Sequence, residues 1–136
     1  MKPGNLEETE NCRRVSAILS RIGDKWTVLV VRELHNGPRR FSEIRRSLGS
    51  ISQKMLTTTL RALERDGFVS RTSYATIPPR VDYALTDLGA EALKAFEAFE
   101  AFAARHWNRV LEARQLFDAR DADQLAPPVL RISTGR

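Results

Sequence analysis

The stretch that decides the fold is residues 41–67, which read FSEIRRSLGSISQKMLTTTLRALERDG. It contains two segments with the apolar spacing of helices, and Gly49 separates them. The spacing predicts a short helix over residues 42–48, capped by Ser42, and a longer helix over residues 52–66. Two helices with a tight break between them are typical of a helix-turn-helix.

The longer of these helices is predicted to have an apolar and a polar face. At about 100° per residue, the apolar face carries Leu56, Leu60 and Leu63. The opposite face carries cations and small hydroxyls, namely Lys54, Thr57, Thr58, Arg61 and Arg65. Such a helix fits the major groove of DNA, where Lys and Arg address guanine and Gln addresses adenine. An ordinary amphipathic surface helix looks the same in isolation, so the neighbouring segments have to decide.

The start of this helix stays open between two serines. Ser50 has capping-box spacing to Gln53, and Ser52 is an equally good cap. The N-terminus of a helix favours a phosphate and usually meets the bases, so Ser52 and Gln53 are both candidate DNA-binding residues.

A β-hairpin is predicted directly after the two helices. Residues 68–72 and 81–85 alternate in polarity, and the loop between them contains Pro78-Pro79. Arg71 and Arg80 flank this loop and are candidate contacts to the DNA backbone or minor groove. A basic hairpin in this position makes the helix-turn-helix a winged one. The predicted fold is therefore mainly α with a small β-hairpin.

Two further helices are predicted upstream, over residues 12–22 and 25–35. The second is apolar nearly all round, which indicates a central buried helix. Residues 39–41 favour a short extended segment. Arg39 and Arg40 within it are candidate phosphate contacts, and the alternative is a solvated pair of cations.

A last, long helix is predicted from a cap at Thr86 or Asp87 to about Leu116. Apolar residues recur along it every three to four positions: Leu93, Phe96, Phe99, Ala103, His106/Trp107 and Val110, with Phe102 beside them. A monomer would expose much of this stripe, which is unusual. We therefore expect a homodimer through the N-terminal and the long C-terminal helices. The alternative is that the stripe packs against the chain's own winged domain.

Length and composition agree with one globular domain. The 136 residues are predicted to form a flexible arm (1–11), a DNA-binding and dimerisation domain (12–117) and a tail (118–136). One cysteine and two distant histidines, His35 and His106, exclude a disulfide framework and a recognisable zinc site. Neither a membrane-spanning run nor a secretory signal is present, so we expect a cytoplasmic protein without metal or cofactor.

The positive charge is concentrated in the middle of the chain. Residues 39–80 hold nine basic and three acidic side chains, a net charge of +6, whereas the remaining residues sum to −1. A localised basic patch is the electrostatic footprint of a polyanion, most often a nucleic acid. Double-stranded DNA is therefore the expected partner.

Four segments of the chain are distinctive in their order and spacing. They are IGDKWT (22–27), GPRRFSEI (37–44), ISQKMLT (51–57), which continues with Leu60, Arg61, Leu63, Glu64 and Gly67, and PPRVDYALTDLG (78–89). Together they make the chain resemble the HxlR-type family of bacterial winged-helix transcription regulators. The resemblance implies a homodimer on a pseudo-palindromic operator, usually a repressor and sometimes an activator. It also implies a recognition helix at Ser52–Asp66 and a wing at Arg71–Arg80.

Cys12 is the candidate for sensing a signal. It stands beside Arg13 and Arg14 at the predicted start of a helix, and both features favour a thiolate. Several regulators similar to this one have a cysteine near this position and respond to electrophiles or oxidants. With no second cysteine, a disulfide has to join two subunits or a small thiol. The alternatives are an unreactive interface residue at Cys12 and a small-molecule inducer.

Two other classes of function fit the sequence less well. A winged-helix module that binds a protein instead of DNA is disfavoured by the basic face of the helix over residues 52–66. An enzyme is disfavoured because the chain has no Gly-rich phosphate loop, no nucleophile beside a base and no metal cluster.

Overall fold

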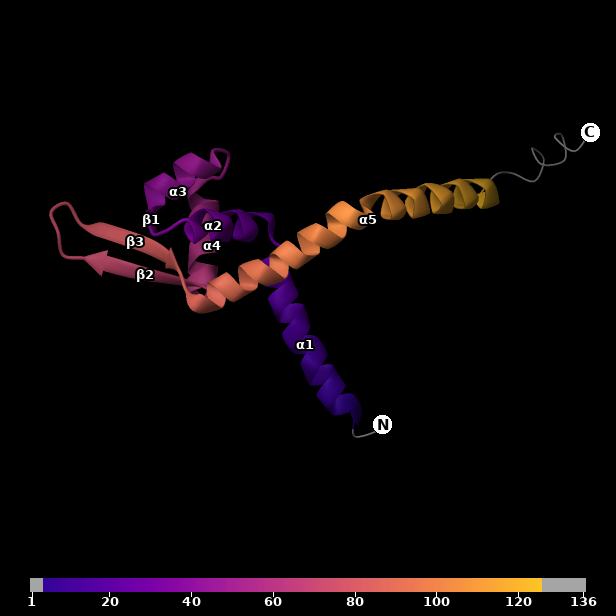
Figure 1. Ribbon diagram of the computed structural model, residues 1–136, viewed down its shortest axis with the longest axis horizontal. Coiled ribbons are helices and arrows are strands. Elements are labelled where there is room, and N and C mark those ends of the chain that lie inside the picture. Colours follow the sequence, from indigo (N-terminus) through magenta and orange to yellow (C-terminus); the bar gives the residue numbers. More distant parts are fainter. Residues whose placement is uncertain (1–3, 126–136) are drawn as a thin grey trace, which may run out of the picture. The chain divides into compact units, whose positions relative to one another are not determined.

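A computed structural model describes the backbone of residues 4–125 and the side chains of residues 8–125 (Figure 1). The chain divides after Glu97 into two compact units, and α5 contributes residues to both. The elements are α1 (Gly4–Ile22), α2 (Lys25–His35), β1 (Arg39–Arg40), α3 (Phe41–Leu48), α4 (Gln53–Arg65), β2 (Val69–Tyr74), β3 (Arg80–Leu85) and α5 (Asp87–Leu125). The predicted fold class, mainly α with a small β-hairpin in a winged helix-turn-helix, is confirmed.

Side-chain caps explain where three of the helices begin. Asp24 accepts the N–H of Trp26 at 2.8 Å at the start of α2. Ser52 Oγ accepts the N–H of Met55 at 3.1 Å, so Ser52 and not Ser50 caps α4. Thr86 Oγ1 accepts the N–H of Gly89 at 3.0 Å and caps α5. Each of these bonds satisfies a backbone donor that the first turn of a helix leaves without a partner.

Two predicted helix ends and one predicted cap are wrong. α1 begins at Gly4, not Cys12, so residues 4–11 are helical and not a flexible arm. α5 continues to Leu125, beyond the predicted end at Leu116. Both predictions followed the apolar periodicity, which covers a shorter stretch of sequence than the helix does. A helix continues where no Pro or Gly interrupts it. Residues 1–3 and 126–136 of the predicted arm and tail lie outside the described residues.

The start of α3 also differs from its predicted cap. The helix begins at Phe41, so Ser42 lies within its first turn. The preceding Arg40 donates its backbone N–H to Glu43 Oε1 at 3.0 Å. That carboxylate replaces the expected serine as the group that ties the helix to its entering strand.

The sheet has three antiparallel strands in the order β1-β3-β2. β2 and β3 run side by side as the predicted hairpin (Figure 1). The short segment predicted at residues 39–41 becomes a third strand, because Arg40 pairs with Asp82 across β1 and β3. Asp82 also pairs with Thr72 on β2, so it occupies the middle of the sheet.

The core of the first unit joins α2, α3 and α4 to the sheet and to the start of α5. Its fully buried side chains are Val30, Leu34, Ile44, Leu56, Leu60 and Leu63. Phe68, Val69 and Leu93 complete the cluster. α2 supplies five buried residues, which confirms its predicted central place. The buried leucines of α4 anchor that helix by one face and leave the other face to solvent.

The second unit, from Ala98 onward, is described up to Leu125 as the continuation of α5. No side chain in residues 98–125 is buried. Large apolar side chains are exposed there, including Phe102 at 61% and Trp107 at 49%. Among the helices described, none is long and apolar enough to cross a bilayer.

Candidate nucleic-acid interface

α4 presents the face that the sequence predicted. Leu56, Leu60 and Leu63 are buried at 0–1% exposure. The five residues predicted on the opposite face are exposed, and so is Gln53 at the start of the helix: Gln53, Lys54, Thr57, Thr58, Arg61 and Arg65. The helix therefore combines a fixed inner face with an outer face that carries three cations and an amide.

The two threonines on this face have their hydroxyl protons engaged within the helix. Thr57 Oγ1 donates to the carbonyl of Gln53, and Thr58 Oγ1 donates to the carbonyl of Lys54, both at 2.9 Å. What remains for a partner is a hydroxyl acceptor and a methyl group on each side chain. A methyl group suits contact with the methyl of thymine. Among the residues predicted to read bases, the donors are thus Gln53, Lys54 and Arg61.

Ser52, also a predicted contact, is committed to capping. Its Oγ accepts the N–H of Met55, although the residue is exposed. The side chain therefore orders the start of the helix, and any contact that it makes outward is secondary to that role.

A hollow lies between α3 and α4 beside Gln53. It has a volume of about 470 Å³ and is lined by Phe41, Ser42, Arg45, Arg46, Gly49 and Gln53. Arg45 and Arg46 are exposed. These two arginines belong to the basic patch of residues 39–80, but no role was predicted for them from the sequence. Their signal was their position in the last turn of α3, directly before the break that leads into α4.

Arg39 and Arg40 differ in their surroundings. Arg39 Nε lies 3.6 Å from Glu33 Oε1, and its Nη1 donates to the Pro38 carbonyl at 3.2 Å. Glu33 also accepts from Ser47 Oγ at 2.7 Å, which fixes the carboxylate between α2 and α3. Arg40 is exposed on the edge strand β1. The second arginine is accordingly the better placed of the two for a phosphate.

The wing carries two exposed arginines, as predicted. Arg71 Nη1 donates to Ser73 Oγ at 3.2 Å. Arg80 forms a two-bond ion pair with Asp82, in which Nε donates to Oδ1 and Nη2 to Oδ2, each at 3.0 Å. These hydrogen bonds lower the pKa of Asp82 and raise the pKa of Arg80. The pair was missed in the sequence, although residues two apart on a strand share a face.

Cys12 is exposed, but its surroundings differ from the prediction. Because α1 begins at Gly4, the residue lies two turns inside the helix. The helix dipole acts mainly within the first turn, so that argument for a thiolate does not apply. Of the two neighbouring cations, Arg14 is within 3.5 Å of Glu10 in an exposed ion pair.

The residues predicted for a dimer interface fall into two groups. Leu93 is 4% exposed within the single chain, and Phe96 is half-buried with the Arg32 guanidinium 5.4 Å from its ring centroid. These two residues pack within the winged unit of their own chain, which agrees with the alternative to a dimer interface. Phe99, Ala103 and Trp107 are exposed, while Val110 is half-buried.

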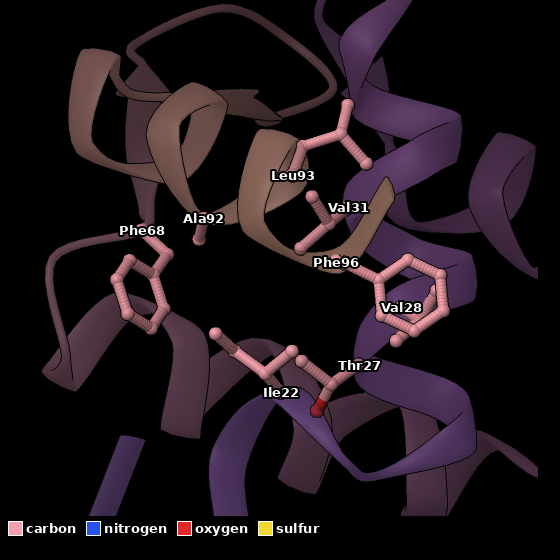
Figure 2. A pocket seen from close by; sticks show the side chains of 8 residues that line it. All are labelled: Ile22, Thr27, Val28, Val31, Phe68, Ala92, Leu93 and Phe96. Carbon is pink, nitrogen blue, oxygen red and sulfur yellow. The ribbon is translucent and has the colours of Figure 1, made fainter. Parts of the chain in front are cut away.

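A small apolar pocket lies where the end of α1 meets α2 and α5. Figure 2 shows the side chains that surround it: Ile22, Thr27, Val28, Val31, Phe68, Ala92, Leu93 and Phe96. Its volume is about 20 Å³. That is room for one water, whereas pockets for drug-sized ligands measure roughly 300–1,000 Å³. As it stands, this pocket is a packing gap and not a site for an inducer of that size.

Comparisons with known proteins agree with this geometry. A family model described as HxlR-like helix-turn-helix matches residues 21–111. The chain is 44% identical over 89 residues to YtfH of Escherichia coli (strain K12), described as an uncharacterized HTH-type transcriptional regulator, and the match covers 65% of this chain and 69% of that one.

Two similar solved structures are regulators too. The reduced form of the transcriptional regulator YodB from B. subtilis matches with a TM-score of 0.62 and 34% identity, over 66% of this chain and 88% of that chain. The redox regulator HypR in its oxidized form matches with a TM-score of 0.61 and 37% identity, over 68% and 95%.

Proposed function

Because the chain belongs to the HxlR-like helix-turn-helix family of transcriptional regulators, we propose that it binds a specific DNA operator as a homodimer and represses by blocking a promoter. The observation that carries this proposal is the division of α4 into a buried leucine face and an exposed basic face. The protein would bind such an operator in the cytoplasm, where the chromosome is accessible. Activation from the same operator is the other sign of regulation that the resemblance allows.

Sequence is read from α4 in the major groove. Gln53, Lys54 and Arg61 supply donors to base edges, while Thr57 and Thr58 supply methyl groups. The other arginines clamp phosphates on both sides of the helix, from Arg39 and Arg40 before it to Arg71 and Arg80 in the wing. Arg45 and Arg46 add two cations beside Gln53. These phosphate contacts set the affinity for any duplex, and the α4 contacts set the preference.

A second copy of the chain covers the exposed aromatic side chains of α5. Phe99, Phe102 and Trp107 present large apolar surfaces that a single chain leaves in water. Homodimers usually bury such surfaces in an interface with two-fold symmetry. Two-fold symmetry also places two recognition helices about 34 Å apart, one turn of duplex. The operator is then a pseudo-palindrome.

Cys12 is the proposed entry point of a redox or electrophile signal. It is exposed on α1, and the similar solved structures include the redox regulator HypR and the reduced form of the regulator YodB. Oxidant or quinone treatment should change the operator affinity of the wild type. An identical response in Cys12→Ser would assign the residue a structural role.

The experiment that tests the proposed function is selection of genomic DNA fragments by the purified protein at two salt concentrations. We expect a pseudo-palindrome with half-sites about one turn apart, and an affinity that falls steeply with salt. Recovery of random fragments at both salt concentrations would mean that the basic face binds DNA without sequence preference. Recovery of no DNA, together with a salt-insensitive protein partner, would favour the interaction-module alternative.

A further inference from the structure

An acidic residue, Asp82, lies within the sheet that carries the wing. Its strand β3 is the central one, with Arg40 opposite on β1 and Thr72 opposite on β2. A carboxylate on a surface that faces phosphates would ordinarily repel them. Its side chain is nevertheless only 13% exposed, whereas that of its partner Arg80 is 48% exposed. The pair therefore presents its cation outward and keeps its anion covered.

The Arg80 guanidinium is held from two sides. Asp82 accepts from Nε and Nη2 at 3.0 Å each, in the fork geometry that fixes the plane of an arginine. Tyr74, which pairs with Arg80 across β2 and β3, places its ring centroid 5.4 Å from Cζ. The fork uses two of the five guanidinium N–H groups. Three N–H groups remain to donate to a phosphate.

We propose that Asp82 is a positioning residue for DNA binding: it holds Arg80 in the conformation that contacts a backbone phosphate. The inference rests on the proposed function, because it needs the wing to touch DNA. An arginine that is already fixed loses less conformational freedom when it binds than a mobile one. Asp82 thus lowers the net positive charge of the surface by one unit, but it preorganises the contact between Arg80 and the phosphate. The lowered pKa of Asp82 agrees with a carboxylate that stays ionised in the pair.

For the removal of Asp82, this inference predicts a change in DNA affinity opposite to the change expected from net charge alone. Removing an anion from a DNA-binding surface ordinarily tightens binding to every sequence and steepens its salt dependence. If Asp82 positions Arg80, Asp82→Asn weakens operator binding by about three- to tenfold although the protein becomes more positive. Arg80→Lys keeps the charge but loses the fork, and should weaken binding to a similar extent.

The test is a double-mutant cycle on the operator recovered by selection. Wild type, Asp82→Asn, Arg80→Ala and the double variant are titrated with operator and with an unrelated duplex at several salt concentrations. Once Arg80 is absent, we expect Asp82→Asn no longer to weaken binding and, by removing an unpaired anion, to leave it unchanged or tighten it, because the carboxylate acts through that side chain. Glu91→Gln is the matched control, since it removes an exposed carboxylate that pairs with Lys94 on α5. It should not weaken binding.

Each outcome bears on the inference. Tighter binding by Asp82→Asn would mean that Asp82 affects DNA only through its negative charge, and it would overturn the inference. Equal weakening in the Arg80→Ala background would also overturn it, because Asp82 would then act by another route, such as support of the hairpin. If Arg80→Ala binds as tightly as wild type, the wing contact and the inference fail together while reading by α4 stands. Absence of duplex binding by the wild type itself is the separate result that defeats the proposed function.

Discussion

The winged unit and the C-terminal helical unit use similar apolar side chains in opposite ways. In the first, the leucines of α4 are fully buried against α2 and the sheet. In the second, Phe102 and Trp107 lie on α5 with 61% and 49% of their surface exposed. A helix that is buried within its own chain gains its stability there, whereas an exposed apolar stripe needs another surface. The predicted recognition face is therefore fixed by the fold of one chain, and the proposed dimer face by association.

The largest expected effect tests the core of the winged unit. Leu60→Ala removes a fully buried side chain and should lower the free energy of unfolding by about 2–5 kcal/mol. Urea denaturation followed by circular dichroism measures this. Ile77→Ala is the control, because Ile77 is fully exposed in the wing loop and its loss should change the stability by less than about 0.5 kcal/mol. Equal effects of the two variants would contradict the packing described for α4.

The second prediction tests the exposed stripe of α5. Trp107→Ala should raise the dissociation constant of the dimer by about 30-fold or more, since large aromatic residues dominate interface energies. Sedimentation equilibrium over a range of protein concentrations measures the constant. Asn108→Ala, on the next residue of the same helix, should leave it nearly unchanged. A wild type that remains monomeric at all concentrations would remove the homodimer from the proposal.

A third prediction separates the two kinds of contact within the winged unit. Arg61→Ala should relax the base preference at one operator position at a cost of about 1–3 kcal/mol, because a donor to a base edge is lost. Arg71→Ala should weaken binding to all duplexes to a similar extent and reduce the salt slope by about one. Titrations with operator and random duplex measure both. Equal losses on the two duplexes for Arg61→Ala would contradict its assignment to base reading.

The sequence predicted the winged unit well because its signals are local and repeated. The leucine spacing of α4, the cap at Asp24 and the alternation of β3 each follow from a short window of residues. Contacts between distant segments left no such signal. The pairing of Arg40 with Asp82 joins β1 to β3 across more than forty residues, and it is this register that makes a three-stranded sheet.

The same reasoning explains the errors along α1 and α5. Apolar periodicity marks the residues that a helix buries, so it gives no signal along a stretch with few apolar residues. Residues 4–11 and 118–125 are helical in the structure although few apolar positions mark them. The sequence also could not show which surface buries each apolar residue, because the stripe from Leu93 to Val110 looks continuous in sequence. The structure buries its first member in the core and leaves Trp107 exposed.

The smallest expected effect concerns the start of α4, where the sequence left two serines open. Ser52 Oγ accepts the N–H of Met55, so Ser52→Ala should lower the free energy of unfolding of the winged unit by about 1 kcal/mol. Ser50→Ala is the matched control two residues away and should have little effect, because Ser52 alone caps the helix. Urea denaturation of both variants distinguishes them. Equal losses would mean that the first turn of α4 depends on both serines, and its base-reading residues would then be less firmly fixed than the buried leucines imply.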